Sequence, residues 1–358
     1  MPITVKPSEA AEILRQCIAT KQPVMMWGSY GIGKSSIVAQ VADAMYAGHY
    51  GCTVDANGRL HDGTGQYTSN RPWLTDLRLV LLDPTDLRGL PMVNGDGRVH
   101  WAAPAFAPKP DCLPMAILLD EINRAPSLVQ NAAFQLVLDR KLGEYKLPDN
   151  VAIIAAGNRE SDGGGVTRMH AALGNRFLHI NVEVDLKDWC TWAITAGINP
   201  VIIAYVRSQP DDLNSPDSKA QASPTPRSWE FVSKTLNPNL PASIERAMIA
   251  GAIGEAVTIK FWSFLTLYRQ LASTVSIDAI LLDPDNTAVP NDVGSQYAIA
   301  SGLAQRSDPN NISRVIRYLS RMPREFAVFA VRDAVQRDPS LNSTPAFTQW
   351  AVQYQDLM

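Results

Sequence analysis

The sequence lacks the features of a disulfide-rich, zinc-binding or membrane-spanning protein. Its four cysteines, Cys17, Cys52, Cys112 and Cys190, are widely separated and form no CxxC pair, so neither a disulfide framework nor a cysteine zinc site is predicted. No stretch approaches the roughly 18 uncharged apolar residues of a membrane span. The first residues, MPITVKPSEAAEILRQ, lack the apolar core of a secretion signal. We therefore expect a cytoplasmic protein without a membrane partner.

An excess of one charge and a cluster of histidines are also missing. The 358 residues include 32 Lys+Arg and 35 Asp+Glu, a formal net charge of −3, which lacks the basic excess of a dedicated nucleic-acid binder. The 5 histidines are scattered, which favours single core or surface roles over a metal site. The hydrophobic content of 46% and the length predict about two folded domains.

The first half of the chain alternates apolar runs with amphipathic stretches, the pattern of βαβ units around a parallel sheet. Five segments are predicted as strands: residues 23–27 (PVMMW), 77–82 (LRLVLL), 116–119 (AILL), 151–156 (VAIIAA) and 177–184 (FLHINVEV). Residues 34–47 and 128–139 have apolar side chains at helical spacing and are predicted as helices. The pattern therefore predicts an α/β fold for this half.

The strand pattern fades from about residue 186 onward, and helices are predicted instead. They cover residues 189–194, 201–206, 229–236, 243–264, 295–304, 312–319 and 326–337. Two polar, proline-bearing segments, residues 208–226 and 283–293, are predicted as loops. The sequence thus predicts an α/β domain over residues 1–186 and a mostly helical domain over residues 187–358.

A glycine-rich motif follows the first predicted strand. Gly28, Ser29, Tyr30, Gly31, Ile32, Gly33, Lys34 and Ser35 match G-x-x-x-x-G-K-[ST] and lead into a helix that continues with Ser36. Glycines let backbone N–H groups point at phosphate oxygens, Lys34 reaches the β- and γ-phosphates, and the Ser35 hydroxyl can ligate Mg²⁺. The alternative, a glycine-rich turn with a chance lysine, is disfavoured because strand, loop and helix fall in register. Residues 28–36 therefore predict a nucleotide site.

Polar residues at the ends of two later strands fit the same site. Asp120 would hold Mg²⁺, and Glu121 would orient and deprotonate an attacking water, although the two could instead be an acidic pair that caps the next helix. Asn158 follows the strand over residues 151–156 and could hydrogen-bond the water or the γ-phosphate, or else only a local turn. An acid pair favours hydrolysis over transfer of the phosphate to a bound substrate.

Together, WGSYGIGKSS and LLDEINRAP resemble the Walker A and Walker B segments of the AAA+ ATPases, and more narrowly of the MoxR-like branch. The resemblance covers most of the first predicted domain and, more loosely, the helical remainder. It implies an αβα P-loop domain with a parallel five-stranded sheet, followed by an all-α lid with extra C-terminal helices. ATP and Mg²⁺ are the implied cofactors, and no guanine-specific N-K-x-D motif follows the Walker elements.

The resemblance also implies roles for particular residues. Asn158 corresponds to sensor 1, Arg176 in ALGNRF to an arginine finger, and Arg227 in TPRSW to sensor 2. A guanidinium from a neighbouring subunit can neutralise charge on the γ-phosphate, and an arginine on the lid can couple nucleotide state to lid angle. Arg159, followed by ESDGGG, stands where the branch usually has Pro. It is either a second trans-acting arginine or part of a loop ion pair.

Two hairpins are predicted outside the sheet. Residues 90–101 surround an Asn94-Gly95 turn signal, and residues 141–147 surround Gly143. Both look like insertions of the MoxR-like branch that face a pore or partner in a ring, and plain solvent-exposed hairpins are the alternative. Residues 48–70 are predicted as either a flexible loop or a small hairpin.

For function, the resemblance implies a Mg²⁺-ATPase that forms a homo-oligomeric ring, a hexamer in this branch, and that remodels or matures a protein partner. The implied partner carries a von Willebrand factor A domain. Assembly belongs to catalysis because an arginine acts in trans. One alternative is an AAA+ motor or restriction-type NTPase on nucleic acid, which the net charge of −3 disfavours. The other is a nucleotide-gated scaffold with little turnover.

Overall fold

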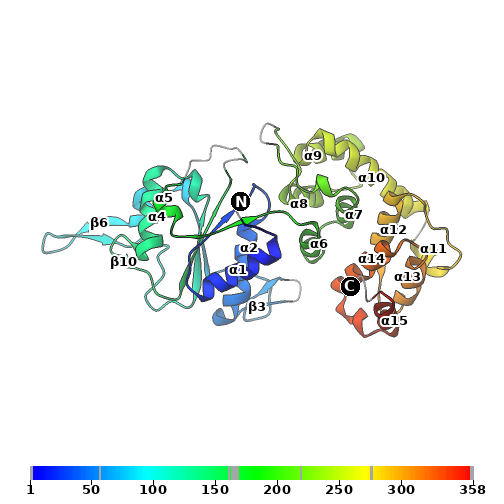
Figure 1. Ribbon diagram of the computed structural model, residues 1–358, viewed down its shortest axis with the longest axis horizontal. Helices are drawn as coiled ribbons and strands as arrows, with labels where there is room; N and C mark the ends of the chain where they lie inside the picture. The colour runs from blue at the N-terminus through cyan, green and yellow to red at the C-terminus, as the bar shows by residue number, and fades with distance from the viewer. Residues whose placement is uncertain are drawn as a thin grey trace. The chain divides into compact units, whose positions relative to one another are not determined.

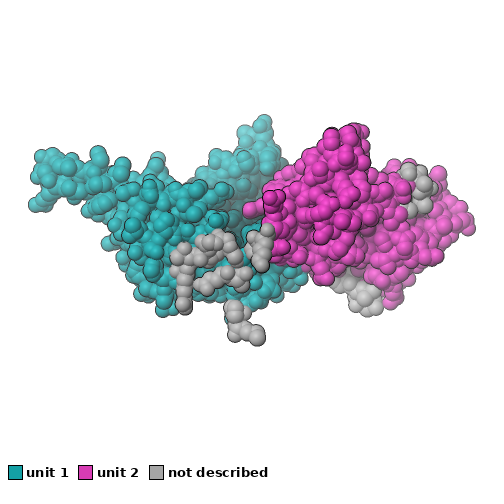
Figure 2. Space-filling view, turned by 90° about the horizontal axis from the view of Figure 1, so that it is seen from above, with its two compact units in different colours: residues 1–185 teal, residues 186–358 magenta. Residues whose placement is uncertain are grey.

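The chain folds into two compact units, residues 1–185 and 186–358 (Figure 2). The structure is a computed structural model, and it describes residues 3–55, 58–159, 162, 169–217, 220–274 and 277–354. Most of the glycine-rich stretch after Arg159 therefore lies outside the described residues.

A six-stranded parallel sheet forms the centre of the first unit (Figure 1). The strand order is β1-β12-β2-β11-β8-β5, and every neighbouring pair is parallel. The strands are β1 (Thr4–Val5), β2 (Val24–Trp27), β5 (Leu74–Arg78), β8 (Met115–Asp120), β11 (Val151–Gly157) and β12 (Leu178–Val182). All seven residues of β11 are buried, as in a parallel sheet that is covered on both faces.

The α/β fold class is confirmed, but the predicted count of five strands is wrong by one edge strand. β1 pairs with β12 through only Thr4 and Val5, which is too short to give an apolar-run signal. The strand predicted over residues 77–82 is also shifted. β5 ends at Arg78, and the 3-10 helix η2 (Leu79–Leu81) follows. Leu79 is fully buried, whereas Leu81 is 74% exposed, so the apolar run continues past the strand into a turn that is buried only in part.

Helices cover both faces of the sheet. Figure 1 shows α1 (Pro7–Ala19) and α2 (Lys34–Tyr46) on one side, and α4 (Ser127–Asp139) and α5 (Ala171–Gly174) on the other. β2 lies between β12 on one side and β11, β8 and β5 on the other. The chain order of the strands thus reverses beside β2, and ligands of open α/β sheets bind at the carboxyl ends of strands at such a point.

The described residues of this unit also form three antiparallel hairpins outside the sheet. Both predicted hairpins are present, as β6 (Leu90–Val93) with β7 (Val99–Ala102) and β9 (Lys141–Leu142) with β10 (Tyr145–Lys146). The segment 48–70 contains a third, β3 (Thr53–Val54) with β4 (Leu60–His61). A short 3-10 helix, η1 (Ala47–Tyr50), precedes it, and α3 (Pro84–Arg88) precedes β6.

The described part of the second unit is helical and contains no strand. Its α-helices are α6 (Leu186–Thr195), α7 (Pro200–Ser208), α8 (Pro226–Thr235), α9 (Ala242–Ile253), α10 (Glu255–Thr274), α11 (Ile277–Leu282), α12 (Val293–Arg306), α13 (Ile312–Leu319), α14 (Arg324–Arg337) and α15 (Pro345–Gln353). Within the described ranges, none of the helices combines the length and apolar character needed to cross a membrane.

One predicted helix of this unit is wrong. Residues 243–264 do not form a continuous helix, because the chain breaks at Gly254 between α9 and α10. Gly254 has φ +79°, and a Cβ there would lie 2.8 Å from the Ala222 carbonyl oxygen. Periodicity alone does not reveal such a break, since apolar spacing resumes in α10.

Candidate nucleotide site

The predicted phosphate loop connects the carboxyl end of β2 to the first turn of α2. Gly33 is the N-cap residue of α2 and has φ +92°, a left-handed conformation that only glycine adopts at little cost. Gly28 is required for a different reason. A Cβ at Gly28 would lie 2.4 Å from Cδ1 of Ile32 and 2.8 Å from the Val182 carbonyl oxygen. The loop therefore packs tightly at Gly28 and ends at the N-terminus of α2, where the helix dipole favours an anion.

The Lys34 side chain lies at the centre of this loop and is only 9% exposed. Its Nζ donates to the carbonyl oxygens of Gly28 and Ser29 over 2.7 and 2.9 Å. It also donates to Oδ1 of Asn158 over 2.9 Å. The structure thus brings together Lys34 and Asn158, which are 124 residues apart in the sequence. An ammonium group in this position can bind phosphate oxygens.

Ser35 and Asp120 meet on the other side of the loop. The Ser35 hydroxyl donates to Oδ2 of Asp120 over 2.9 Å. A hydroxyl and a carboxylate at this spacing fit Mg²⁺, which binds through one or two protein oxygens together with phosphates and water. Among the described residues, no group of three or more His, Cys, Asp or Glu side chains could hold a metal alone. The Ser35 hydroxyl and the Asp120 carboxylate therefore fit a Mg²⁺ ion whose other ligands are phosphate and water.

Glu121 follows Asp120 and has an unusual backbone. Its φ of 54° and ψ of 34° are left-handed, which costs a non-glycine residue about 1–2 kcal/mol. Its N–H donates to Oδ1 of Asp120 over 2.9 Å. Its carboxylate accepts from Arg124, with the closer oxygen 3.3 Å from Nη1. Backbone strain of this kind is typical of functional sites, and the Arg124 contact occupies the carboxylate that was predicted to activate water.

Sequence reasoning missed the role of Asn123 in this site. Asn123 is 1% exposed, and its Nδ2 donates to the Asn158 carbonyl oxygen over 2.7 Å. A Cβ at Gly157 would lie 2.5 Å from Oδ1 of Asn123, so the two segments pack closely. Asn123 therefore ties the segment after β8 to the position of Asn158. Asn123 is part of the LLDEINRAP segment, but its contact with Asn158, 35 residues later, has no signal in the sequence.

Asp76 is another residue near the site that the sequence did not predict, and it lies on β5, the strand next to β8. Asp76 belongs to β5, which pairs with β8 so that Arg78 is opposite Asp120. Partial burial, and secondarily the negative charge of Asp120, raise the pKa of the Asp76 carboxyl. The two acids therefore repel each other, and a cation bound between Asp120 and phosphate would relieve this repulsion.

The predicted arginines lie in different parts of the chain. Arg176 is exposed in the turn between α5 and β12, and Arg227 is exposed in the first turn of α8 in the second unit. Within the described residues, neither side chain forms an ion pair. Arg159, by contrast, donates to the Val182 carbonyl oxygen over 3.1 Å and lies 3.4 Å from Oε1 of Glu183. Of the two predicted alternatives for Arg159, this geometry matches the ion pair within the chain.

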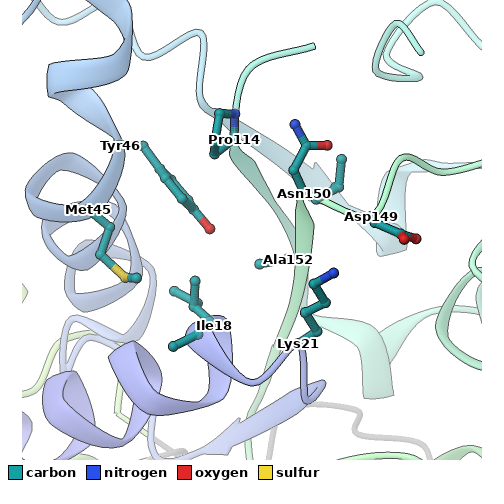
Figure 3. Close-up of a pocket in the computed structure, with 10 residues that line it drawn as sticks. Ile18, Lys21, Met45, Tyr46, Pro114, Asp149, Asn150 and Ala152 are labelled. Atoms are coloured by element: carbon teal, nitrogen blue, oxygen red, sulfur yellow. The ribbon is translucent and has the colours of Figure 1, made fainter. Parts of the chain in front are cut away.

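A separate cavity of about 210 Å³ lies at the opposite edge of the sheet. Figure 3 shows Ile18, Met45 and Tyr46 of α1 and α2 facing the start of β11. Burial raises the pKa of Tyr46 to about 12. Because this cavity is at the amino ends of β8 and β11, it is distinct from the phosphate loop at the carboxyl end of β2.

Comparison with known proteins leaves the family of the chain open. No protein family and no curated protein matches the sequence. A candidate ATPase from Cytophaga hutchinsonii aligns with 92% of this chain and 81% of its own, at 14% identity and a TM-score of 0.35. NtrX from Brucella abortus in complex with ADP aligns with 98% of this chain and 68% of its own, at 14% identity and a TM-score of 0.36. Likenesses this remote assign no activity.

Proposed function

We propose that the chain is a Mg²⁺-dependent ATPase of the AAA+ type. One observation carries the proposal: Lys34 contacts Asn158, and Ser35 contacts Asp120, at the carboxyl edge of the sheet beside β2. These are the residue types that phosphoryl transfer from a nucleotide to water requires. A parallel sheet followed by a helical unit also agrees with the architecture that the AAA+ resemblance implies.

Each side chain then has a separate task. Lys34 exchanges its carbonyl partners for β- and γ-phosphate oxygens, and Asn158 hydrogen-bonds the attacking water or the γ-phosphate. Ser35 and Asp120 would hold Mg²⁺, which supplies charge neutralisation of the phosphates. Glu121 takes a proton from the water once its carboxylate leaves Arg124. The 3.3 Å contact of Glu121 with Arg124 therefore describes a resting arrangement of the base.

Arg176 and Arg227 complete the site from elsewhere. We propose that Arg176 reaches the γ-phosphate of a neighbouring subunit and that Arg227 senses nucleotide from the lid. Their exposure, without ion pairs among the described residues, leaves both guanidinium groups accessible to a nucleotide. A trans-acting arginine makes head-to-tail assembly part of catalysis, and a closed ring satisfies every such interface. A hexamer is the proposed form.

The proposed task of the ring is remodelling or maturation of a protein partner. The partner that the MoxR-like resemblance implies carries a von Willebrand factor A domain. A tagged Glu121→Gln variant, which would hold ATP without hydrolysis, is the bait for capture from native lysate in the presence of Mg-ATP. Recovery of such a protein only with ATP supports this part of the proposal. Its absence, in preparations where the bait is assembled, contradicts it.

The decisive experiment measures ATPase rate against protein concentration for wild type, Glu121→Gln and Arg176→Ala. We expect a specific activity that climbs with concentration, is lost in both variants, and returns in part when the two are mixed. Arg15→Ala is the matched control, because Arg15 is an exposed arginine of α1 that pairs with Glu12 three residues away. Activity that is independent of concentration and of Arg176 would mean a monomeric enzyme.

A further inference from the structure

Two hydrogen bonds connect the end of β2 to the turn that contains Arg176. The Trp27 indole Nε1 lies 2.8 Å from Nδ1 of His179, and Nε2 of His179 lies 2.8 Å from the Gly174 carbonyl oxygen. An indole N–H can only donate, so Nδ1 must accept. The neutral imidazole then carries its proton on Nε2, which donates to Gly174. The direction of both hydrogen bonds is therefore fixed.

Two aromatic rings lie beside the His179 imidazole. The planes of Trp27 and His179 are within 8° of parallel, with centroids 6.0 Å apart, which suits a hydrogen bond in the plane of both rings. Phe177 packs edge-on against the imidazole, with centroids 6.5 Å apart and planes at 76°. Although His179 is exposed, its imidazole is held by two directed hydrogen bonds, through which a displacement of one partner can reach the other.

One end of this connection belongs to the Arg176 turn. The Gly174 carbonyl oxygen accepts from the Phe177 backbone N–H as well as from His179, over 3.1 and 2.8 Å. The Arg176 N–H donates to the Leu173 carbonyl oxygen over 3.1 Å. The turn is thus closed on itself, and His179 is the side chain that hydrogen-bonds its Gly174 carbonyl from the sheet.

The other end belongs to the phosphate loop. Trp27 immediately precedes Gly28, whose carbonyl oxygen accepts from Lys34 over 2.7 Å. Lys34 Nζ donates to oxygens of Gly28, Ser29 and Asn158, so it has to release at least one of them when it binds phosphate. Release of the Gly28 oxygen would change the hydrogen-bond partners of the backbone that follows Trp27. His179 hydrogen-bonds both Trp27, which precedes this backbone, and Gly174 in the Arg176 turn.

We propose that His179 is a positioning residue that couples the nucleotide site of its own subunit to the arginine that the same subunit presents to its neighbour. The inference rests on the proposed function, in which Arg176 acts in trans. His179 does not contact the nucleotide in this scheme. Its imidazole holds the Arg176 turn in the position that is set by the occupied phosphate loop.

The test places His179→Ala in one or the other partner of a mixed oligomer. In a mixture of Glu121→Gln with Arg176→Ala, only the Arg176→Ala subunit hydrolyses ATP, using the arginine of its Glu121→Gln neighbour. We expect His179→Ala to reduce this activity at least tenfold when added to the Glu121→Gln chain. Added to the Arg176→Ala chain, it should reduce activity less than twofold. Equal losses in both arrangements would overturn the proposal, because they indicate a general structural role.

Two further variants separate positioning from folding. His179→Gln keeps one acceptor and one donor, and we expect it to restore most of the activity that His179→Ala loses. His170→Ala is the matched control, since His170 is exposed at the start of α5 and its side chain makes no capping hydrogen bond. Failure of His179→Gln to rescue, with a melting temperature equal to that of wild type, would also contradict the proposal.

A spectroscopic readout keeps the inference separate from the ATPase proposal. The ¹⁵N-indole resonance of Trp27, assigned by Trp27→Phe, and the backbone amides of residues 174–176 are followed as Mg²⁺ and a non-hydrolysable ATP analogue are added. In wild type we expect both sets of signals to shift. In His179→Ala only the signals near the phosphate loop should shift. If the amides of residues 174–176 respond equally in both proteins, His179 is not the connection, whether or not the chain hydrolyses ATP.

Discussion

Ser35 lies in the first turn of α2, and its hydroxyl donates to the Asp120 carboxylate over 2.9 Å. Ser35→Ala removes this oxygen ligand but keeps the loop backbone. We therefore expect weaker binding of Mg²⁺, with an unchanged affinity for nucleotide in the absence of metal. Loss of one interaction with a charged group costs about 1.5–3 kcal/mol of binding free energy. The Mg²⁺ concentration for half-maximal activity should therefore rise roughly 10–100-fold. A Mg²⁺ titration of ATPase rate measures this shift.

The control for this prediction is Ser127→Ala at the exposed start of α4. It should leave the Mg²⁺ titration unchanged. If Ser35→Ala lowers the maximal rate without moving the Mg²⁺ midpoint, Ser35 is not a metal ligand.

Lys34 is a second residue whose loss should act on binding rather than on folding. Its ammonium is held by neutral oxygens of Gly28, Ser29 and Asn158, and phosphate is a stronger partner than any of these. We expect Lys34→Ala to lower affinity for a fluorescent ATP analogue by about 100-fold, from roughly 3 kcal/mol of lost charge-assisted hydrogen bonding. Lys146→Ala on exposed β10 is the control. Equal affinity of both variants would exclude the predicted site.

The sequence revealed these residues because their signal is local. The phosphate loop, its strand and its helix are continuous, and Asp120 and Glu121 end an apolar run. Asn123 and His179 had no such signal, since their partners lie 35 and 152 residues away. Which distant side chains meet depends on strand order, and the apolar runs predict strands without predicting their order.

At the scale of elements, the break between α9 and α10 shows how one residue overrides a helical pattern. Gly254 has φ +79°, and a Cβ would lie 2.8 Å from the Ala222 carbonyl oxygen. Gly254→Ala should therefore destabilise the second unit by about 2 kcal/mol, from left-handed strain and the close contact together. Urea unfolding monitored by circular dichroism measures the change.

Gly251 provides a matched control three residues earlier. It lies inside α9, and a Cβ there would meet no atom within 4 Å. Gly251→Ala should stabilise the protein by about 0.5–1 kcal/mol, because alanine favours the helix. A destabilisation of equal size in both variants would show that α9 and α10 do not break at Gly254.

An ion pair between the same helices predicts how stability depends on pH. Glu245 of α9 accepts from both Nη atoms of Arg269 in α10 over 2.8 Å. These hydrogen bonds, ahead of the opposing effect of burial, hold the pKa of the Glu245 carboxyl below its ordinary value of 4.5. A carboxyl whose pKa is lower in the folded state than in the unfolded state stabilises the fold. This stabilisation is present when the pH is above the pKa of the unfolded state, and it is lost as the pH falls through the pKa of the folded state.

Glu245→Gln should accordingly cost about 1–3 kcal/mol at pH 7, and the difference from wild type should shrink as pH falls below about 4.5. Urea unfolding across this pH range measures it. Glu255→Gln is the control. Glu255 is 63% exposed in its pair with Arg246, and surface pairs contribute about 0–1 kcal/mol. A pH-independent cost for Glu245→Gln would mean that packing, not charge, explains the loss.

The contact between two hairpins is a further feature that the prediction of separate strands did not include. β9–β10 and β6–β7 were predicted as separate insertions, yet they pack together. A Cβ at Gly143 would lie 2.5 Å from the Arg88 carbonyl oxygen, and the Trp101 N–H donates to the Glu144 carboxylate over 3.3 Å. Leu90, Val93 and Val99 stay exposed on β6–β7. The two insertions therefore form one projection of the first unit.

At the scale of the whole molecule, the proposed mechanism divides its arginines between the two units. Arg176 belongs to residues 1–185, and Arg227 belongs to residues 186–358. The units are joined covalently between Asp185 and Leu186. If Arg227 binds the nucleotide held by the first unit, ATP restricts the second unit relative to the first. A ligand that binds one arrangement better than others shifts the population toward it.

Arg227→Ala should therefore reduce the effect of nucleotide on the dimensions of the molecule to less than half, while leaving its fold intact. Small-angle X-ray scattering of wild type should show a changed radius of gyration when Mg²⁺ and a non-hydrolysable ATP analogue are added. Arg227→Ala should show less than half of that change, with an unaltered melting temperature because the side chain is exposed in the first turn of α8.

Lys234→Ala is the control for this last prediction, since Lys234 is an exposed cation of the same helix that pairs with Glu230 four residues away. It should keep the full nucleotide response. The Arg227→Ala variant also distinguishes nucleotide binding from the change in dimensions. Its affinity for the fluorescent analogue should fall less than that of Lys34→Ala, because its phosphate loop remains complete. A full scattering response in Arg227→Ala would show that the helical unit follows the nucleotide through another contact, and the lid role of Arg227 would be wrong.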